Sequence, residues 1–295
     1  MMLREYNGKG LLLEHKRDET PDPFYFIMHA HDVCELYYLI EGKGYLTVEG
    51  VNYPLEKDAV LLVREGEMHT VHVDPTASYE RITVNFDYKD IDPDLIWKEL
   101  HGMIYDHELG QSNLTRAGES RDYLRTLFSR LSATTEVASA NGSEEVRIIF
   151  KAILCELLHI RRRDIDADRL GEDTEFALVL DDVSKSEAKL VVEIISYINN
   201  HLFDIKNLTE IESAFYFSRS YINRVFKAAT KSSVWNYVLL KRLIAAQSFL
   251  KGGMPAKLVA EKCGFRDYSS FYKQYKNKFG TAPTSEKTGL SLITV

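Results

Sequence analysis

Residues 258–280 read LVAEKCGFRDYSSFYKQYKNKFG, a spacing that predicts two short helices meeting at a tight turn. Gly264 stands at the corner, where a residue with positive φ favours a sharp helix end. Beyond it, Phe271, Tyr275 and Phe279 recur every four residues and give the second helix one apolar stripe. The opposite face carries hydroxyl and basic groups, which suit base edges and phosphates in a DNA major groove.

A second copy of this plan lies upstream, in residues 208–227 (LTEIESAFYFSRSYINRVFK). A lone corner of this kind is more often an ordinary helical hairpin with a solvated face. Residues 233–250 have the pattern of one long helix that connects the two copies. Two helix-turn-helix units on one connecting helix favour DNA binding over the plain hairpin.

Length and composition indicate a globular chain of two domains. The chain has 295 residues, of which 45% are hydrophobic, and its three cysteines have no paired spacing. This cysteine pattern argues against a disulfide framework and against a Cys-based zinc site. No apolar run approaches the roughly 20 residues of a membrane span, and the N-terminal residues lack the apolar centre of a secretory signal. We therefore expect a cytoplasmic protein with no membrane partner.

The net charge of −7 is unevenly distributed along the chain. Residues 190–295 contain 15 Lys and Arg against 7 Asp and Glu, whereas the remainder contains 22 against 37. The C-terminal third is therefore basic and the rest is acidic. This split is the expected footprint of a DNA-binding module that is joined to a separate sensing domain.

The first 86 residues are rich in aromatic and β-branched residues interrupted by glycine turn signals, which predicts many short antiparallel strands. The expected strands are residues 24–28, 35–41, 44–48, 59–63, 70–73 and 81–86. Strands that follow one another so closely favour a small barrel or jelly roll.

Three histidines and a carboxylate form a candidate site within this predicted barrel. His29 and His31 point to the same face of an extended chain, and Glu35 joins them if the chain bends after His31. His69, on a later strand, closes the set. Three imidazoles and a carboxylate suit Zn, Fe, Ni or Mn, so a divalent metal in the barrel is one hypothesis.

The other hypothesis is a small organic effector, such as a carbohydrate, held by the same interior. Glu35 and Tyr37 share one strand face, and Tyr25 and His29 share another, so the interior offers aromatic walls and polar groups. The candidate effector-binding residues are Tyr25, His29, His31, Glu35, Tyr37 and His69. The residues alone leave the choice between metal and organic ligand open.

This region resembles the cupin family. The first cupin motif, HxH followed by Glu and Gly at fixed spacing, is matched by His29, His31, Glu35 and Gly42. The second motif keeps Gly66 and His69, whereas the positions where the family favours Gly, Pro and Asn are occupied by Asp58, Arg64 and Val73. The resemblance implies a cupin-like barrel, and the departures weaken the implication of an enzyme.

Helical periodicity follows the predicted strands. Helices are expected at residues 95–105, 121–131 and 144–163, and the last has a broad apolar stripe. This stripe suits packing against the barrel and suits self-association as a homodimer. Residues 164–188 are polar and acidic and are interpreted as an interdomain linker.

The last 100 residues resemble the C-terminal domain of the AraC/XylS family of transcription regulators. The second unit carries the family pattern at Val259-Ala260, Gly264-Phe265, Ser270-Phe271-Tyr272, Phe279-Gly280 and Pro283. The first unit keeps Ser218, Tyr221, Ile222, Arg224, Phe226 and Lys227. Its corner departs from the pattern, because Glu212 replaces a small residue and Tyr216 replaces the usual glycine.

The resemblance implies that two recognition helices contact successive major grooves of double-stranded DNA. By motif position, the base-reading residues are Ser220, Asn223 and Arg224 in the first unit and Tyr268, Ser269, Tyr272 and Lys273 in the second. Phosphate contacts are expected from Arg219, Lys227, Lys276 and Lys278. RNA polymerase is a further expected partner of such a regulator.

We therefore expect an α+β, multidomain chain. Its parts are a cupin-like sensing barrel (1–90), a helical dimerisation segment (91–163), a linker (164–188) and an all-α domain with two helix-turn-helix units (189–290). The predicted function is DNA-binding transcription regulation in response to a small molecule, without enzyme activity. The alternatives are a cupin metalloenzyme of isomerase or dioxygenase type and a regulator whose barrel serves only dimerisation. The effector, the operator and the choice between activation and repression are open.

Overall fold

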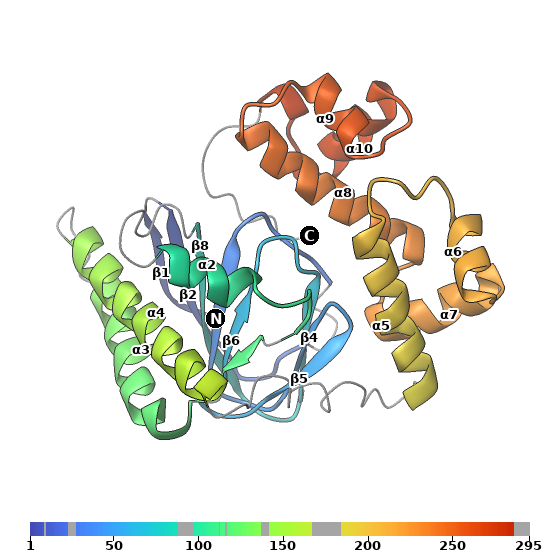
Figure 1. Ribbon diagram of the computed structural model, residues 1–295. Coiled ribbons are helices and arrows are strands. Elements are labelled where there is room, and N and C mark those ends of the chain that lie inside the picture. Colours follow the sequence, from blue (N-terminus) through green and yellow to red (C-terminus); the bar gives the residue numbers. More distant parts are fainter. Residues whose placement is uncertain are drawn as a thin grey trace.

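The computed structural model describes residues 1–8, 10–22, 28–87, 97–111, 113–115, 117–136, 142–166 and 184–285. An N-terminal domain of β-strands is followed by helices and then by a helical C-terminal domain, which confirms the predicted fold class (Figure 1). Two helices, α3 and α4, lie on one side of the strands, and the C-terminal helices lie on another (Figure 1).

Two antiparallel sheets build the N-terminal domain, with strand orders β1-β2-β8-β3-β6-β9 and β5-β4-β7. The strands are β1 (Met2–Gly8), β2 (Leu11–Asp18), β3 (Cys34–Glu41), β4 (Gly44–Val48), β5 (Val51–Leu55), β6 (Val60–Val63), β7 (His69–Val73), β8 (Tyr79–Phe86) and β9 (Leu114–Thr115). Strands β1, β2 and β5 were not predicted. The side chains of β1 and β2 do not alternate between apolar and polar as those of a half-buried strand do, and β5 contains Pro54, a residue that argues against a strand. The predicted strand at 24–28 lies outside the described residues except for Met28, which is not in a strand.

Strand β3 divides its side chains between two apolar cores. Tyr37 and Leu39 belong to the core between the two sheets, whereas Leu36 and Tyr38 belong to the core between the large sheet and the helices. Because successive residues of a strand face opposite sides, a strand buried on both faces reads as a continuous apolar run. The large sheet is therefore the middle layer of the N-terminal half.

Helices α2 (Trp97–Tyr105), α3 (Arg121–Glu136) and α4 (Gly142–Asp166) cover the large sheet, with a short 3-10 helix (Gly118–Ser120) before α3. The apolar stripe of α4 is buried within the chain, from Val146 through Phe150 to Leu158. The stripe therefore serves packing against the sheet, and its side chains are not available to a second copy. No helix in the described ranges is both long and apolar enough to cross a membrane.

Two of the residues that depart from the second cupin motif attach these helices to the sheet. The Asp58 carboxylate accepts hydrogen bonds from Nε and Nη2 of Arg125 on α3, at 3.0 and 2.5 Å. The Arg64 guanidinium donates to the carbonyl oxygens of Ile104 and His107, at 3.3 and 3.1 Å. The departures therefore have a structural reason, since each side chain fixes a segment of the helical layer.

The C-terminal domain contains helices α5 (Lys185–Asn200), α6 (Leu208–Phe215), α7 (Arg219–Thr230), α8 (Val234–Lys251), α9 (Ala256–Lys262) and α10 (Tyr268–Phe279), followed by a 3-10 helix (Pro283–Ser285). Ser218, Ser233 and Asp267 cap α7, α8 and α10 through side-chain oxygens. Two helix-turn-helix units thus flank α8. Of the predicted linker, residues 167–183 lie outside the described residues, and the described ends are largely helical.

Both helix-turn-helix corners contain a residue with positive φ. Gly264 has a φ of +73°, and a Cβ added there would meet the carbonyl oxygen of Phe203 at 2.4 Å. At the equivalent corner Tyr216 has a φ of 58°, and its side chain is 93% exposed. The first corner therefore adopts the left-handed conformation without the residue that favours it.

Replacing Phe150 by Ala tests whether the α4 stripe is core. Phe150 is fully buried, so we expect Phe150→Ala to lower the free energy of unfolding by about 3–5 kcal/mol in urea denaturation. Ile148, on the same helix and 57% exposed, is the matched control, and Ile148→Ala should change it by less than about 0.5 kcal/mol. Equal small losses in both variants would contradict the assignment of the stripe to the core.

Replacing Tyr216 by Gly tests the strain at the first corner. The exposed ring makes little packing contribution, so relief of the left-handed conformation should stabilise the chain by about 1 kcal/mol in the same measurement. Tyr216→Ala retains the Cβ atom and should give no such gain. A loss of stability in Tyr216→Gly would show that the corner is not strained.

Candidate effector site and nucleic-acid interface

The predicted histidines converge in the N-terminal domain. His29 and His69 exchange two backbone hydrogen bonds, at 3.0 and 2.8 Å, which bring their segments side by side. The ring centroid of His69 lies 4.3 Å from that of His29 and 5.0 Å from that of His31. One ligand atom from each of the three rings lies within 4.8 Å of the others. Such a cluster is compact enough to surround a single ion.

The outer nitrogens of two rings are tied to the backbone. Nδ1 of His31 lies 2.7 Å from the carbonyl oxygen of Val33, and Nδ1 of His69 lies 2.9 Å from that of Glu67. A carbonyl oxygen only accepts, so each Nδ1 must carry the proton that it donates. When the ring is neutral, its Nε2 presents a lone pair toward the cluster. The Nε2 atoms of both rings are buried and have no hydrogen-bond partner. This is the tautomer that metal-binding histidines adopt.

Glu35 supplies the negative charge of the cluster. Its carboxylate oxygens lie 3.4 Å from Nε2 of His31 and 3.9 Å from Nε2 of His69. Burial alone would raise the pKa of Glu35, but the contacts with His31 and His69 lower it to about 2. Burial lowers the pKa of His69 to about 3, whereas Glu35 outweighs burial and raises the pKa of His31. The cluster therefore favours a carboxylate beside one protonated ring.

The aromatic part of the predicted site is arranged differently from the histidines. Tyr37 is buried on β3, and its hydroxyl forms a short hydrogen bond with the Tyr79 hydroxyl, so this group already has a protein partner. Tyr25 lies outside the described residues. The structure thus brings His29, His31, Glu35 and His69 together, and it gives Tyr37 a place in the core between the sheets.

On α7, the predicted DNA contacts differ in how freely they face solvent. Ser220 and Arg224 are exposed, and Arg224 forms an ion pair of 2.8 Å with Glu187 on α5. Asn223 is half-buried. Its amide donates to the Arg219 carbonyl oxygen at 3.1 Å and accepts from the backbone of Val234 at 3.3 Å. Asn223 therefore joins α7 to the start of α8.

On α10, the exposed predicted contacts are Ser269, Lys273 and Lys276. Tyr268 and Tyr272 are half-buried, and Tyr268 packs against the apolar cluster that joins α8, α9 and α10. The outer face of α10 thus presents hydroxyl and ammonium groups, while its aromatic residues hold the helix in place.

Two residues that shape this domain were not predicted as functional. Glu212, at the small-residue position, accepts the backbone N–H of Arg219 at 2.7 Å and pairs with its guanidinium at 3.0 Å. Arg242 on α8 donates to the carbonyl oxygens of Leu202, Ile205 and Gly264, at 2.7, 2.5 and 2.8 Å. An arginine within an apolar helix was the available signal for Arg242, since such a group needs buried acceptors.

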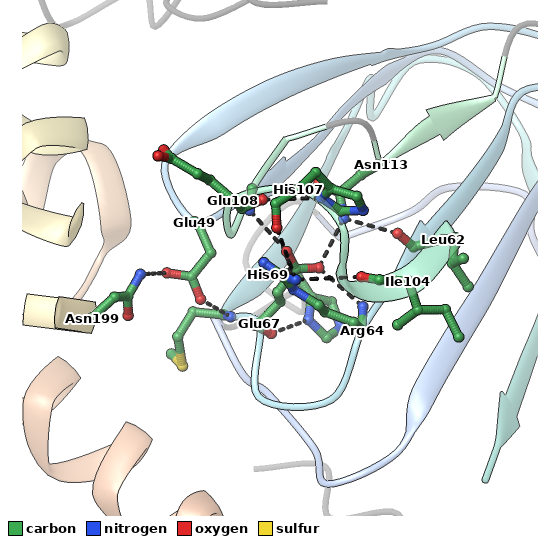
Figure 2. A network of polar contacts seen from close by, with 12 residues as sticks. Glu49, Leu62, Arg64, Glu67, His69, Ile104, His107, Glu108, Asn113 and Asn199 are labelled. Atoms are coloured by element: carbon green, nitrogen blue, oxygen red, sulfur yellow. Dashed lines mark hydrogen bonds and ion pairs between the residues drawn. The ribbon is translucent and has the colours of Figure 1, made fainter. Parts of the chain in front are cut away.

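A buried polar network surrounds Glu67 beside His69, as Figure 2 shows. Glu67 is fully buried and accepts hydrogen bonds from the backbone of Arg64 and from the Asn113 amide, at 3.0 and 2.8 Å. Burial raises the pKa of Glu67. The network fixes the turn from which His69 begins β7.

Two family models match the chain. Residues 13–157 match an AraC-like ligand binding domain, and residues 212–288 match a helix-turn-helix domain. Both models describe parts of a transcription regulator, which sets the metalloenzyme alternative aside.

The curated relatives have the same character. Over 109 residues the chain is 33% identical to the probable transcriptional regulator LumQ of Photobacterium leiognathi, a match that covers 37% of this chain and 44% of that protein. Over 285 residues it is 23% identical to the Msm operon regulatory protein of Streptococcus mutans, with 95% and 93% covered.

Among solved structures, ToxT from Vibrio cholerae with a bound unsaturated fatty acid aligns with a TM-score of 0.39 at 12% identity. The alignment covers 97% of this chain and 99% of that chain. From the family models, the chain belongs to the AraC family of transcriptional regulators, with an AraC-like ligand-binding domain followed by a helix-turn-helix domain.

Proposed function

We propose that this DNA-binding regulator senses a divalent transition metal ion, which is held by His29, His31 and His69 with Glu35 as the carboxylate. The observation that carries this proposal is the Nε2 atom of His69, which is buried and has no hydrogen-bond partner although the rings of His29 and His31 lie beside it. A buried polar atom without a partner carries a desolvation cost, which a bound ion would remove. Three imidazoles and one carboxylate suit Zn, Fe, Ni or Mn.

A small organic effector, such as a carbohydrate, is the second candidate for the same residues. It is favoured by the Glu35 carboxylate and the adjacent imidazoles, which would accept and donate hydrogen bonds to hydroxyl groups. The compactness of the cluster favours the ion, because the ligand atoms of the three rings lie within 4.8 Å of one another.

We assign the sequence-specific DNA contacts to exposed and half-buried side chains of the two recognition helices. The base contacts proposed are Ser220 and Arg224 on α7 and Ser269, Tyr272 and Lys273 on α10. Tyr268 on α10 is also proposed as a base contact. Arg219, Lys227, Lys276 and Lys278 are proposed to contact phosphates. For Asn223 we propose a positioning role, because its amide is already bound at both ends.

We also propose the domain bounds 1–90, 91–163, 164–188 and 189–290. In addition, we propose that the chain forms a homodimer and contacts RNA polymerase. Because the α4 stripe is buried, the homodimer would have to use another surface of the chain.

Zinc titration with histidine variants tests the sensing proposal. By calorimetry, His31→Gln and His69→Gln should each weaken Zn²⁺ binding about tenfold or more, because each removes one ligand. His159→Gln, on the exposed side of α4, is the matched control and should bind as the unaltered protein does. Equal affinity in the three variants would place the ion elsewhere. If His31→Gln and His69→Gln keep their affinity for Zn²⁺ but lose the response of DNA binding to a carbohydrate, the organic effector is favoured.

Replacing Arg224 by Ala tests the reading of bases by α7. Arg224 lies on the exposed face of the first recognition helix and an arginine binds guanine bidentately, so Arg224→Ala should relax specificity at one base pair at a cost of about 1–3 kcal/mol. Lys227→Ala should instead weaken binding to every sequence alike. Affinities for a selected site and its single-base-pair variants, at fixed salt, distinguish the two. Uniform weakening by Arg224→Ala would make Arg224 a phosphate contact.

A further inference from the structure

The side chains of residues 28–32 alternate between two sides of the segment. The rings of His29 and His31 belong to the histidine cluster. Met28 and Ala30, which alternate with them, are buried in the apolar core of the C-terminal domain. Asp32, next in the alternation, forms an ion pair of 2.6 Å with Lys251 of α8. Because successive side chains of an extended segment point to opposite sides, one short segment carries both the cluster and a contact with the DNA-binding domain.

The segment that pairs with it has the same arrangement. The His69 ring belongs to the cluster, whereas Met68 is 1% exposed and packs into the C-terminal core. Backbone hydrogen bonds join the two segments, between His29 and His69 and from Gly66 to the His31 carbonyl oxygen. The ligand atoms and the docking side chains are therefore parts of one small hydrogen-bonded unit.

Glu49 completes the docking surface at the tip of the β4–β5 hairpin, beside α5 and α8 (Figures 1 and 2). Its carboxylate is buried and accepts hydrogen bonds from Lys241, Tyr237 and Asn199 of the C-terminal domain, at 2.7, 2.6 and 3.0 Å. It also accepts the backbone N–H of Met68 at 2.7 Å. Burial alone would raise the pKa of Glu49, but Lys241 and these donors lower it, so the carboxylate stays ionised.

The turn geometry directs Glu49 to this place. Glu49 and Gly50 have φ values of +48° and +82°, both in the left-handed region that a two-residue hairpin turn of this hand requires. A Cβ added to Gly50 would lie 2.9 Å from Cδ1 of Ile195 on α5. The hairpin tip therefore fits closely against α5, and a larger residue than glycine would displace it.

The contacts hold α8 near both ends. Tyr237 and Lys241 bind Glu49 in the first half of the helix, and Lys251 at its last residue binds Asp32. Between these contacts lies a cavity of about 270 Å³, which Asp32 and Lys241 help to line. Since α8 connects the two helix-turn-helix units, these contacts set the placement of both units relative to the N-terminal domain.

We propose that metal occupancy of the histidine cluster and docking of α8 on Glu49 and Asp32 are thermodynamically linked, each strengthening the other. This proposal rests on the proposed function, since it takes the cluster as the ligand site. In the docked arrangement the three imidazoles already converge. An ion therefore binds this arrangement without the free-energy cost of moving the three rings together. When α8 leaves, Met28, Ala30 and Met68 lose their packing, and the segments that hold the rings lose a constraint. A ligand that binds one arrangement more tightly shifts the population toward it.

The test measures zinc affinity in variants that weaken docking and keep all three histidines. Glu49→Gln removes the buried charge from the N-terminal side, and Lys251→Gln removes the ion pair from the α8 side. Lys257→Gln, an exposed lysine on α9, is the matched control. Calorimetry gives the Zn²⁺ affinity of each full-length variant, and small-angle X-ray scattering without metal reports whether the two domains remain docked. Circular dichroism verifies that each variant is folded.

We expect Glu49→Gln and Lys251→Gln to expand the particle and to bind Zn²⁺ about three- to tenfold more weakly, while Lys257→Gln changes neither property. Zinc should also slow hydrogen exchange in α8 of the unaltered protein but not of His69→Gln. Undocked variants that bind Zn²⁺ with unaltered affinity would overturn the linkage and leave the metal site intact. Unchanged scattering in both variants would overturn the role of these residues in docking. Absence of Zn²⁺ binding by the unaltered protein would overturn the metal assignment and the linkage together.

Discussion

A buried carboxylate sets the relation between the two halves of this protein. Glu49 is 2% exposed, and its hydrogen-bond donors come from both domains. A charge removed from water is tolerated only when its partners are close and well oriented, and loss of one partner leaves the others uncompensated. The hairpin turn, α5 and α8 therefore have to meet in one arrangement. The positions of the histidine segments and of both helix-turn-helix units follow from it.

The features that the sequence predicted most directly are those with local signals. The second helix-turn-helix corner was predictable because its signals are local, namely the glycine at Gly264 and the four-residue spacing of Phe271, Tyr275 and Phe279. The histidine cluster was predictable for a similar reason, since the spacing of His29, His31 and Glu35 places them together. The fourth member, His69, lies on a later strand and was identified by its position in the cupin motif.

The features that were missed depend on contacts distant in sequence. Glu49 precedes one of the glycines that signal turns, and its neighbours in the sequence do not indicate a contact between domains, because Lys241 lies 192 residues further along. Strand β2 begins with three apolar residues in succession, since both faces of that part are covered, and it therefore lacks the expected alternation. In sequence, the apolar stripe of α4 was equally consistent with packing on the sheet and with a homodimer interface. The packing of Phe150 against Phe86 on the sheet distinguishes the two.

On the DNA-binding face, the contacts of a residue can differ from the role that its motif position predicts. Asn223 stands where a base contact was expected, yet its amide satisfies the carbonyl of Arg219 and the first N–H of α8. Glu212 replaces a small residue at the first corner and supplies an acceptor for the start of α7. In both cases a polar side chain serves the orphan backbone groups of a helix end, which sequence spacing alone does not reveal.

In the proposed function, a ligand in the N-terminal domain controls DNA binding by the C-terminal domain. The most direct measurement is the affinity of the full chain for a site selected from random DNA, determined at fixed salt while Zn²⁺ is titrated. We expect this affinity to change in step with zinc occupancy, and we expect the change to disappear in His69→Gln. An affinity that is the same at every zinc concentration, in a protein that binds zinc, would contradict it.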